Sequence, residues 1–496
     1  MVDYAETVII GAGPAGCGAG LTLSQAGRTC MILDDREIPG GMCRSIRWRG
    51  ATFDVGPHRF FTKSEDVFRI WQSSLGRDLI SVDRLTRVLY RKKLFNYPLS
   101  PVNALLGLGV STSVSAMAAY GLTALKRKIS PRQPTTFEEW VTDNFGSVLY
   151  EAFFKHYTEK VWGIPCSRIS ADWASQRIKG LNLARAVYNA MTSHKSAQIK
   201  TLANRFVYPR NGSGSLYERI MQTIVQRGST YTPNATVTGI QEYQGRWLIS
   251  YQPATGPSRE VLCDHVLSSM SVVQLLRSLK PVPSPEILAA GSALRFRNHY
   301  CVHLLVENGP TPFPDNWIYV HSPELSAARV ANYASFCPSM QGAEGFFPLT
   351  VEFFSFPGDA VSLLDDSERV QLALRELGNA GLLSSKSVVC GAFVTFTKDA
   401  YPVIEVGYAS HVSRIKSYLM NIKNLQTCGR AGLFQYNNQD HSMMTGVLAA
   451  RNILGAKYDL WSVNEDAEYH ESGTAPDLCE EDRHEPNTDE PSIGAP

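Results

Sequence analysis

A short apolar strand followed by a glycine-rich turn constrains the fold of this chain more than any other feature. Residues 7–10 (Thr-Val-Ile-Ile) are apolar or β-branched, and residues 11–16 (Gly-Ala-Gly-Pro-Ala-Gly) follow directly, before a helical run of small residues. Strand, G-x-G-x-x-G turn and helix in this order indicate a dinucleotide-binding unit. Gly11 allows the tight turn, Gly13 lets a pyrophosphate approach the backbone, and Gly16 lets the helix pack closely on the strand. The sequence therefore predicts an α/β fold with a dinucleotide site near its N-terminus.

A second apolar run supports this prediction. Residues 30–33 (Cys-Met-Ile-Leu) end at Asp34, about twenty residues beyond the glycine motif, where a carboxylate accepts the ribose hydroxyls. Asp35 is the neighbouring candidate for the same role. A glycine turn in an ordinary α/β sheet would not explain an acid at this position.

Two further motifs decide between flavin and nicotinamide. Gly40 and Gly41 stand just beyond Asp34, and this D-x5-G-G layout resembles the second fingerprint of a large FAD family that includes amine oxidases, protoporphyrinogen oxidase and UDP-galactopyranose mutase. Near the other end of the chain, Gly429 and Arg430 belong to a Cys-Gly-Arg-Ala-Gly turn that resembles the C-terminal flavin motif of that family. The resemblance implies that the arginine meets the FAD pyrophosphate. It also implies FAD as prosthetic group, with NADPH or NADH left open as its reductant.

Motifs outside the dinucleotide unit resemble the UDP-galactopyranose mutases in particular. Residues 56–62 (Gly-Pro-His-Arg-Phe-Phe-Thr) look like the mutase segment that lies against the flavin, which implies a cofactor contact at Pro57 and a catalytic role for His58. Residues 157–163 (Tyr-Thr-Glu-Lys-Val-Trp-Gly) resemble the segment whose tryptophan, here Trp162, lines the nucleotide pocket. The collinear match runs from about residue 5 to residue 457.

The closing motif of the mutases has a counterpart after Arg430. It places Tyr436 on the tyrosine that contacts the substrate diphosphate, and Asn438 and Gln439 beside the cofactor. Tyr401, in an Ala-Tyr-Pro-Val segment, resembles a residue that borders the substrate.

The arginines of the mutase pattern are only partly present. Arg177 is the one secure counterpart of a paired-arginine motif, and Arg329 follows two alanines where the family has Tyr-Thr. Arg297 is a further candidate phosphate contact. Arginine suits a diphosphate because its planar fork donates paired hydrogen bonds and stays charged. We therefore expect His58, Arg177 and Arg297 as catalytic residues, and Trp162, Arg329, Tyr401 and Tyr436 as substrate-binding residues, although each taken singly also fits a structural role.

The distribution of these motifs predicts a discontinuous molecule. We expect an FAD-binding domain of the Rossmann, glutathione-reductase-like type over residues 1–92, 205–290 and 400–460, with Val237 reaching the adenine end of FAD. A helical insertion would fill residues 93–204, and an antiparallel sheet platform residues 291–399.

Charge patterning marks two unusual segments. From residue 464 to the end there are 11 acidic residues and one basic residue, which predicts a disordered acidic tail. Residues 94–125 carry no charge and have three basic residues on each side. Polar residues interrupt this stretch, so buried helices are the favoured interpretation, ahead of peripheral membrane contact and of a membrane span.

The cysteines and the N-terminus narrow the remaining possibilities. The 10 cysteines form no C-x-x-C pair and have no histidine spaced to join them, so we expect neither a metal site nor a disulfide framework. The first residues resemble no secretory signal, which favours a cytoplasmic location. Nothing in the sequence indicates a nucleic-acid partner, and the oligomeric state stays open.

The leading functional hypothesis is a redox-neutral mutase that uses reduced flavin to interconvert pyranose and furanose forms of a nucleotide-linked sugar. It accounts for the lack of any Ser-His-Asp, metal or paired-acid motif. The alternative is an FAD-dependent oxidase or dehydrogenase of the amine oxidase or protoporphyrinogen oxidase type. A binding protein that keeps FAD as a structural relic is a third interpretation.

Overall fold

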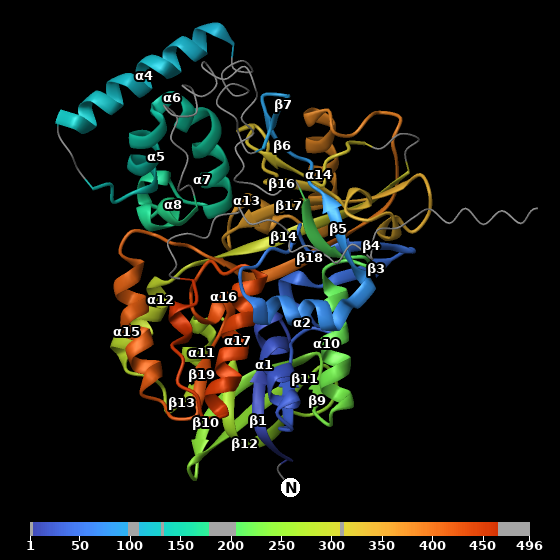
Figure 1. Ribbon diagram of the computed structural model, residues 1–496, viewed down its shortest axis with the longest axis vertical. Helices are drawn as coiled ribbons and strands as arrows, with labels where there is room; N and C mark the ends of the chain where they lie inside the picture. Colours follow the sequence, from blue (N-terminus) through green and yellow to red (C-terminus); the bar gives the residue numbers. More distant parts are fainter. Residues whose placement is uncertain (1–2, 98–108, 130–132, 178–204, 308–311, 465–496) are drawn as a thin grey trace, which may run out of the picture.

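The computed structural model describes residues 3–97, 109–129, 133–177, 205–307 and 312–464. Two sheets, with helices packed against them, make up most of the molecule, and a group of helices stands at the end opposite the N-terminus (Figure 1). The acidic tail predicted beyond Asn464 lies outside the described residues, as do residues 98–108 of the uncharged stretch. Among the described residues, we find no helix that has both the length and the apolar character needed to cross a membrane.

The first sheet has eight strands and contains the N-terminal strand near its centre. Its strands are β1 (Asp3–Ile10), β2 (Cys30–Leu33), β9 (Thr230–Thr232), β10 (Ala235–Tyr243), β11 (Arg246–Pro253), β12 (Arg259–Ser268), β13 (Leu279–Lys280) and β19 (Leu425–Thr427). The strand order is β13-β10-β11-β12-β1-β2-β9, and β19 also pairs with β12. Strands β19, β12, β1, β2 and β9 run parallel, whereas β11 is antiparallel to both of its neighbours. Parallel strands need cover on both faces, and the apolar run predicted at residues 7–10 meets that need.

Helices cover both faces of this sheet because successive side chains of a strand point in opposite directions. Ile9 belongs to the core that also contains residues of α1 (Pro14–Gln25), α2 (Glu65–Leu75), α10 (Gly214–Gln226) and α17 (Gln439–Ile453). Val8 and Ile10 belong instead to the core shared with α11 (Val272–Ser278), α12 (Pro285–Ala293) and α15 (Tyr408–Met420). The predicted strand is therefore buried from both sides.

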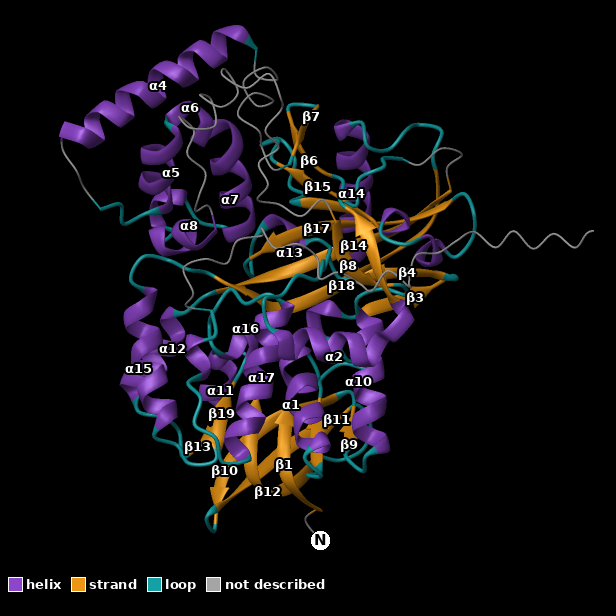
Figure 2. Ribbon diagram, viewed as in Figure 1, coloured by secondary structure: helices purple, strands orange, loops and turns teal. Residues whose placement is uncertain are grey.

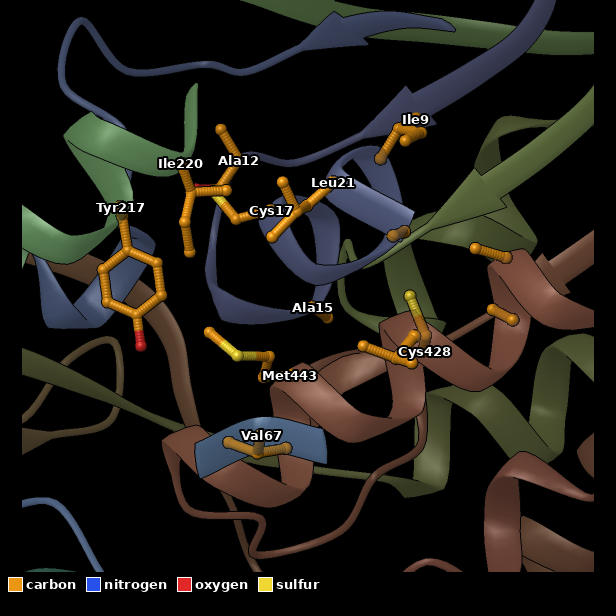
Figure 3. Packing of buried hydrophobic residues seen from close by; sticks show 14 of the residues in the cluster. Ile9, Ala12, Ala15, Cys17, Leu21, Val67, Tyr217, Ile220, Cys428 and Met443 are labelled. Carbon is orange, nitrogen blue, oxygen red and sulfur yellow. The ribbon is translucent and has the colours of Figure 1, made fainter. Parts of the chain in front are cut away.

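The first of these cores brings together segments from opposite ends of the sequence. Figure 3 shows Ala15 of α1 near Met443 of α17 and near Cys428. A Cβ atom built on Gly446 of α17 would lie 1.9 Å from the carbonyl oxygen of Ala15. The two helices therefore touch through their backbones, which fixes α17 against the glycine turn.

The second sheet has seven strands, in the order β18-β14-β17-β16-β15-β6-β7, and lies across the helices from the first (Figure 2). Its strands are β6 (Thr86–Tyr90), β7 (Lys93–Asn96), β14 (Phe296–Glu307), β15 (Trp317–Val320), β16 (Arg329–Asn332), β17 (Phe346–Ser355) and β18 (Val388–Pro402). All neighbours are antiparallel except β15 and β6, which run parallel. Helix α14 (Asp366–Ala380) packs on this sheet through Ala373 and Leu377.

This arrangement differs from the sequence-based division where strands of the second sheet begin and end: Lys93–Asn96, expected in the helical insertion, forms β7, and β18 continues to Pro402, past the expected limit at residue 399. Residues 86–92 were assigned to the FAD-binding part, but Thr86–Tyr90 forms β6 of the second sheet, paired with β15. The pairing buries Val88 and Leu89 completely or nearly so. A five-residue strand next to a hairpin gives no sequence signal for which sheet it joins, since the pairing partner lies more than two hundred residues away.

The helical group consists of α4 (Val110–Ile129), α5 (Phe137–Phe145), α6 (Ser147–Tyr150), a π-type turn (Glu151–Lys155), α7 (His156–Trp162) and α8 (Ala171–Arg177). Helix α5 begins at a capping box, in which Thr136 accepts from the backbone N–H of Glu139. Phe137, Val141 and Phe145 are buried and recur at helical spacing. Trp162 at the end of α7 joins the same core.

Two short ribbons complete the fold between the sheets: β3 (Ser45–Trp48) with β4 (Ala51–Asp54), and β5 (Leu79–Asp83) with β8 (Arg205–Pro209). The carboxylate of Asp54 is fully buried and accepts from Ser45 Oγ at 2.5 Å, from the backbone N–H of Ser213 and from the hydroxyl of Tyr208. Burial raises its pKa to about 6. This one side chain ties both ribbons to the start of α10.

Candidate functional site

A cavity of about 410 Å³ lies where the parallel strands of the first sheet end. Gly11, Asp34 and Ser269 each follow the last residue of a strand, and all three line the cavity. The carboxyl ends of parallel strands are the usual place for ligands in α/β sheets. Residues 397–400 of β18 form part of the opposite wall, so both sheets contribute to the cavity.

Most of the residues predicted to bind the cofactor line this cavity. They are Gly11, Gly13, Asp34, Gly41, Val237, Gly429, Arg430, Asn438 and Gln439, together with His58 from the catalytic set. Three predicted residues, Gly16, Gly40 and Pro57, are not in the lining of the cavity. Gly40 lies just behind it, where its N–H donates to the carbonyl of Ala12 at 2.8 Å.

The two glycine motifs meet at the cavity wall. A Cβ atom on Gly41 would lie 3.1 Å from the Cα of Gly13, so no larger residue fits between these backbones without displacement. Gly16 is a packing position, because its Cβ would lie 1.8 Å from the carbonyl oxygen of Gly11. The close packing of helix on strand that the spacing indicated for Gly16 agrees with this distance.

Two helices begin at the cavity without a side-chain cap. The N-cap of α1 is Gly13 and that of α17 is Asn438, and neither end has a capping hydrogen bond from a side chain. Uncapped N-termini present backbone N–H groups and a positive dipole end. Such ends suit phosphate groups or other anionic atoms of a bound cofactor.

Asp34, and not Asp35, is the buried carboxylate at the end of β2. Its Oδ2 accepts from the N–H of Ala12 at 2.5 Å and its Oδ1 from the N–H of Arg36 at 2.8 Å. Asp35 is exposed. Burial raises the pKa of Asp34 to about 6, although these two backbone hydrogen bonds act in the opposite direction.

Arg430 lines the cavity and lies next to two tyrosine rings. Its Nε donates to the carbonyl of Asn437 at 2.7 Å. Its guanidinium carbon lies 4.8 Å from the ring centre of Tyr401 and 5.1 Å from that of Tyr436. The tyrosines predicted to contact substrate therefore lie beside the arginine predicted to contact the cofactor.

A buried ionic cluster lies behind these rings. Glu352 Oε2 accepts from Arg329 at 2.6 Å and lies 2.8 Å from Nε2 of His299, and Arg329 also donates to the hydroxyl of Tyr401 at 3.2 Å. Burial alone would raise the pKa of Glu352, but the charge of Arg329 outweighs it and lowers that pKa to about 2. Among the described residues, Arg329 Nε and Glu352 Oε1 are buried without a hydrogen-bond partner. The cluster therefore contains charged groups, and the N–H at Arg329 Nε is a donor without an acceptor among the described residues.

The same cluster contains the one group of possible metal ligands in the described part of the chain. Ligand atoms of His299, Cys301 and Glu352 lie within 4.8 Å of one another. However, the carboxylate already pairs with Arg329, whose positive charge would oppose a cation. We therefore assign Glu352 to Arg329.

His58 lines the cavity on the segment that the sequence placed against the flavin. Its Nε2 lies 3.0 Å from the carbonyl of Val55, and burial lowers its pKa to about 4. At neutral pH the ring is therefore uncharged, with the proton on Nε2 and an acceptor at Nδ1. Gln439 donates to the carbonyls of His58 and Arg59 and so fixes this segment to α17.

The aromatic residues of the substrate set pack against one another. Trp162 is only 1% exposed, with its ring centre 5.6 Å from that of Tyr436, in an edge-to-face contact. Tyr401 lies 5.4 Å from Tyr436, between their ring centres. The structure thus brings Trp162, Tyr401, Tyr436 and Arg329 together. Neighbouring side chains cover Trp162, so its ring presents no open face on which a base could stack.

The two remaining predicted arginines differ from this group. Arg297 is buried and donates to the carbonyls of Lys160, Val161 and Phe354 and to the carboxylate of Asp359. These contacts anchor the end of α7 and correct the expectation of a phosphate contact at Arg297. Arg177 is the last residue of α8, and its side chain lies outside the described part of the chain.

Several residues of the cavity were not predicted. They are Ser271, Gln274, Arg277, Thr397, Lys398 and Asp399. Ser271 Oγ donates to Asp399 Oδ2 at 2.8 Å and so links α11 to β18 across the cavity. A sequence signal existed for each side: Ser271 follows a parallel strand, and Asp399 directly precedes the Ala-Tyr-Pro-Val segment.

Comparison with known proteins places the chain in a family. Residues 15–454 match the family described as flavin containing amine oxidoreductase. The chain belongs to this family. It is therefore an FAD-dependent enzyme, and the uncapped helix ends and close glycine backbones at its cavity fit a dinucleotide of that kind.

Within the family, the chain is similar to two nucleotide-sugar mutases. It is 32% identical to "Probable UDP-galactopyranose mutase" of Klebsiella pneumoniae over 172 residues, which is 33% of this chain and 43% of that protein. It is 31% identical to dTDP-fucopyranose mutase of Escherichia coli over 171 residues, or 34% of this chain and 44% of that protein. The match thus spans less than half the length of either relative.

Two other comparisons cover more of the chain. A phytoene desaturase of Fusarium fujikuroi is 24% identical over 331 residues, which is 57% of this chain and 52% of that protein. The crystal structure of a reduced UDP-galactopyranose mutase superposes with a TM-score of 0.81, covering 94% of this chain and 98% of the other at 20% identity. The resemblance to a mutase-like FAD flavoprotein is confirmed, and this member of the family has an α/β flavoprotein fold shared with the mutases and the amine oxidases.

Proposed function

We propose that this enzyme interconverts the pyranose and furanose forms of a sugar linked to a nucleoside diphosphate, and that it does so with reduced FAD. Its two mutase relatives are named for sugars in which a nucleoside diphosphate is joined to a hexopyranose. Support comes from these relatives and from the charges around the cavity. The FAD-binding part would be of the Rossmann, glutathione-reductase-like type, built from residues 1–85, 205–290 and 400–460.

Residues around the cavity would contact each part of FAD. Asp34 would accept the ribose hydroxyls, the first turn of α1 would face the pyrophosphate, and Val237 would border the adenine. Arg430 would add a positive charge to the pyrophosphate, and the start of α17 at Asn438 would face the isoalloxazine ring. The segment around His58 would close the remaining side.

The observation that carries the proposal is the state of Arg329. Its guanidinium is held by Glu352 and Tyr401, but Nε is buried and has no partner among the described residues. A buried donor without an acceptor costs about 1–3 kcal/mol, which a bound anionic group would recover. With Arg430 on the other side of Tyr401, two guanidinium groups flank the aromatic cluster, and because Glu352 balances the charge of Arg329, one net positive charge remains there. Such a site attracts a diphosphate and repels a cationic amine.

Each residue of the site has a definite task in this proposal. Arg329 and Tyr436 would bind the diphosphate and stabilise the negative charge that it gains on leaving the sugar. Neutral His58 would accept a hydrogen bond from a sugar hydroxyl at Nδ1, and the packed rings of Trp162 and Tyr401 would exclude water. Reduced FAD supplies the nucleophile for the anomeric carbon when it is bound.

An oxidoreductase is the second candidate, and one observation favours it. The phytoene desaturase match covers 57% of this chain, more than either mutase match. In that case the aromatic cluster would border an apolar substrate, and Arg329 would be structural.

Ligand binding to the holoenzyme separates the two candidates. UDP should change the absorbance spectrum of the bound FAD, and Arg329→Met should weaken UDP binding by about tenfold or more, since hydrogen bonds to a charged group are worth 1.5–3 kcal/mol. Arg414→Met is the control, because Arg414 is an exposed residue whose ion pair with Glu286 has an N···O distance of 3.8 Å. An enzyme indifferent to UDP but reduced by an amine or an apolar substrate would be an oxidoreductase.

A further inference from the structure

Helix α4 presents its large apolar side chains to solvent. Val114, Met117, Leu122, Leu125 and Ile129 are between 41% and 75% exposed. At 3.6 residues per turn they fall within an arc of about 140° and extend over about 22 Å of the helix. A helix that belonged only to a soluble core would turn this arc inward.

The opposite face of α4 is the one that packs on the protein. Ala116 is buried there, and a Cβ atom on Gly146 would lie 3.0 Å from the backbone N of Tyr120, so α4 rests closely on the start of α6. The hydroxyls of Ser113, Ser115 and Thr123 bond to carbonyls of the preceding turn and so need no outside partner. The apolar arc is therefore the outer surface of a helix whose inner contacts are already made.

The charged residues of α4 and of the turn between β6 and β7 are all basic. Lys126 and Arg127 are exposed on α4, and the helix contains no acidic residue. Arg91 and Lys92, also exposed, form the turn between β6 and β7, at the same end of the molecule as α4 (Figure 1). Apolar side chains next to cationic ones suit a surface with an apolar interior beneath an anionic outer layer.

We propose that α4 docks the enzyme on the surface of an anionic lipid bilayer, with its apolar arc among the acyl chains and Lys126 at the level of the headgroups. Interfacial helices combine an apolar face with Lys or Arg in the same way. The part of the uncharged stretch that lies in α4 would then serve as a membrane contact, an interpretation that the sequence favoured less than buried helices.

A second copy of the chain fits this surface less well. In an antiparallel pair, Lys126 and Arg127 would face the positive N-terminal end of the partner helix, and in a parallel pair the cations would face one another. Since α4 has no carboxylate, neither arrangement offers these cations a partner. Anionic headgroups supply that partner at any orientation about the membrane normal.

Vesicle flotation of the holoenzyme tests the proposal independently of the reaction. The protein should float with vesicles of phosphatidylcholine and phosphatidylglycerol, and much less with phosphatidylcholine alone. Leu122→Ser with Leu125→Ser should lower the affinity for vesicles by about 100-fold, because burying each leucine side chain among acyl chains adds a factor of about ten or more to that affinity. Lys126→Glu with Arg127→Glu should lower it by at least about tenfold.

The control replaces exposed apolar residues elsewhere. Val282→Ser with Leu363→Ser removes side chains of similar exposure outside α4, and vesicle binding should not change. FAD absorbance and thermal unfolding show whether each variant is folded. If the leucine variant does not fold, the charge variant still tests the proposal. Failure of the wild-type protein to float with anionic vesicles would overturn the proposal. So would equal loss in the control, or a dimer that dissociates in the leucine variant without any vesicle binding.

Discussion

At the scale of single residues, two buried carboxylates have opposite pKa shifts because their neighbours differ. Burial is the largest influence on Asp34 and outweighs its hydrogen bonds from two backbone N–H groups, so its pKa rises to about 6. Glu352 faces Arg329, whose charge outweighs the same burial and lowers the pKa to about 2. The first carboxylate is suited to accepting bonds from a ligand, whereas the second holds a cation in place.

Asp34→Asn is expected to weaken the binding of FAD to the apoprotein by about 10- to 100-fold, the worth of a hydrogen bond to a charged group. Ribose hydroxyls stabilise the ionised carboxylate, so wild-type affinity should fall as the pH drops below about 6, and the variant should lose this dependence. Fluorescence titration with FAD measures both effects. Asp35→Asn is the control, and a larger effect there would assign the ribose contact to the other aspartate.

Glu352→Gln is expected to destabilise the protein by about 3–5 kcal/mol at neutral pH, because it leaves the buried Arg329 without its counter-charge. The pKa of Glu352 is lowered in the folded state, so its contribution is present above the ordinary value of 4.5 and is lost as the pH falls towards 2. Denaturant unfolding should show the difference between wild type and variant shrinking over that range.

Glu286→Gln is the matched control for this measurement. Glu286 is exposed, and its ion pair with Arg414 should be worth less than about 1 kcal/mol. A Glu352 variant as stable as this control would contradict the role assigned to the buried pair.

At the scale of elements, contact between helix backbones holds the cavity together. Gly446→Ala should cost about 3 kcal/mol or more, since its Cβ would lie 1.9 Å from the carbonyl of Ala15. Gly378→Ala in α14 meets nothing within 4 Å and should instead stabilise by about 0.5–1 kcal/mol. Thermal unfolding of the two variants compares them directly. Equal effects would show that α1 and α17 do not depend on this approach.

Whether a feature could be predicted from the sequence depended on whether its contacts are made by neighbouring elements of the chain. The turn at Gly11 and the carboxylate at Asp34 were predictable because strand, turn and helix are consecutive in the chain. The anchoring role of Arg297 was not, since its acceptors lie on α7 and β17, far apart in sequence. The burial of Trp162 depends likewise on Tyr436, which comes from another part of the chain.

At the scale of the whole molecule, the cavity lies between two sheets that the chain crosses repeatedly. The first sheet takes strands from the beginning, middle and end of the sequence, and β18 of the second sheet closes the cavity. FAD would therefore touch segments that no single stretch of chain connects. At a free concentration of 100 times its Kd, FAD should add about 2.7 kcal/mol to the free energy of unfolding, in one cooperative transition followed by calorimetry. Two separate transitions, with only one shifted by FAD, would contradict this coupling.

The proposed interconversion of pyranose and furanose forms leaves the flavin in the redox state in which it started. The most direct test is to reduce the holoenzyme anaerobically with one equivalent of dithionite, add UDP-galactopyranose, and count the product molecules formed per FAD by chromatography. A mutase should form many product molecules per reduced FAD and leave the flavin reduced. The oxidised enzyme should form no product. No more than one product per FAD, or turnover that consumes oxygen in proportion to product, would contradict it.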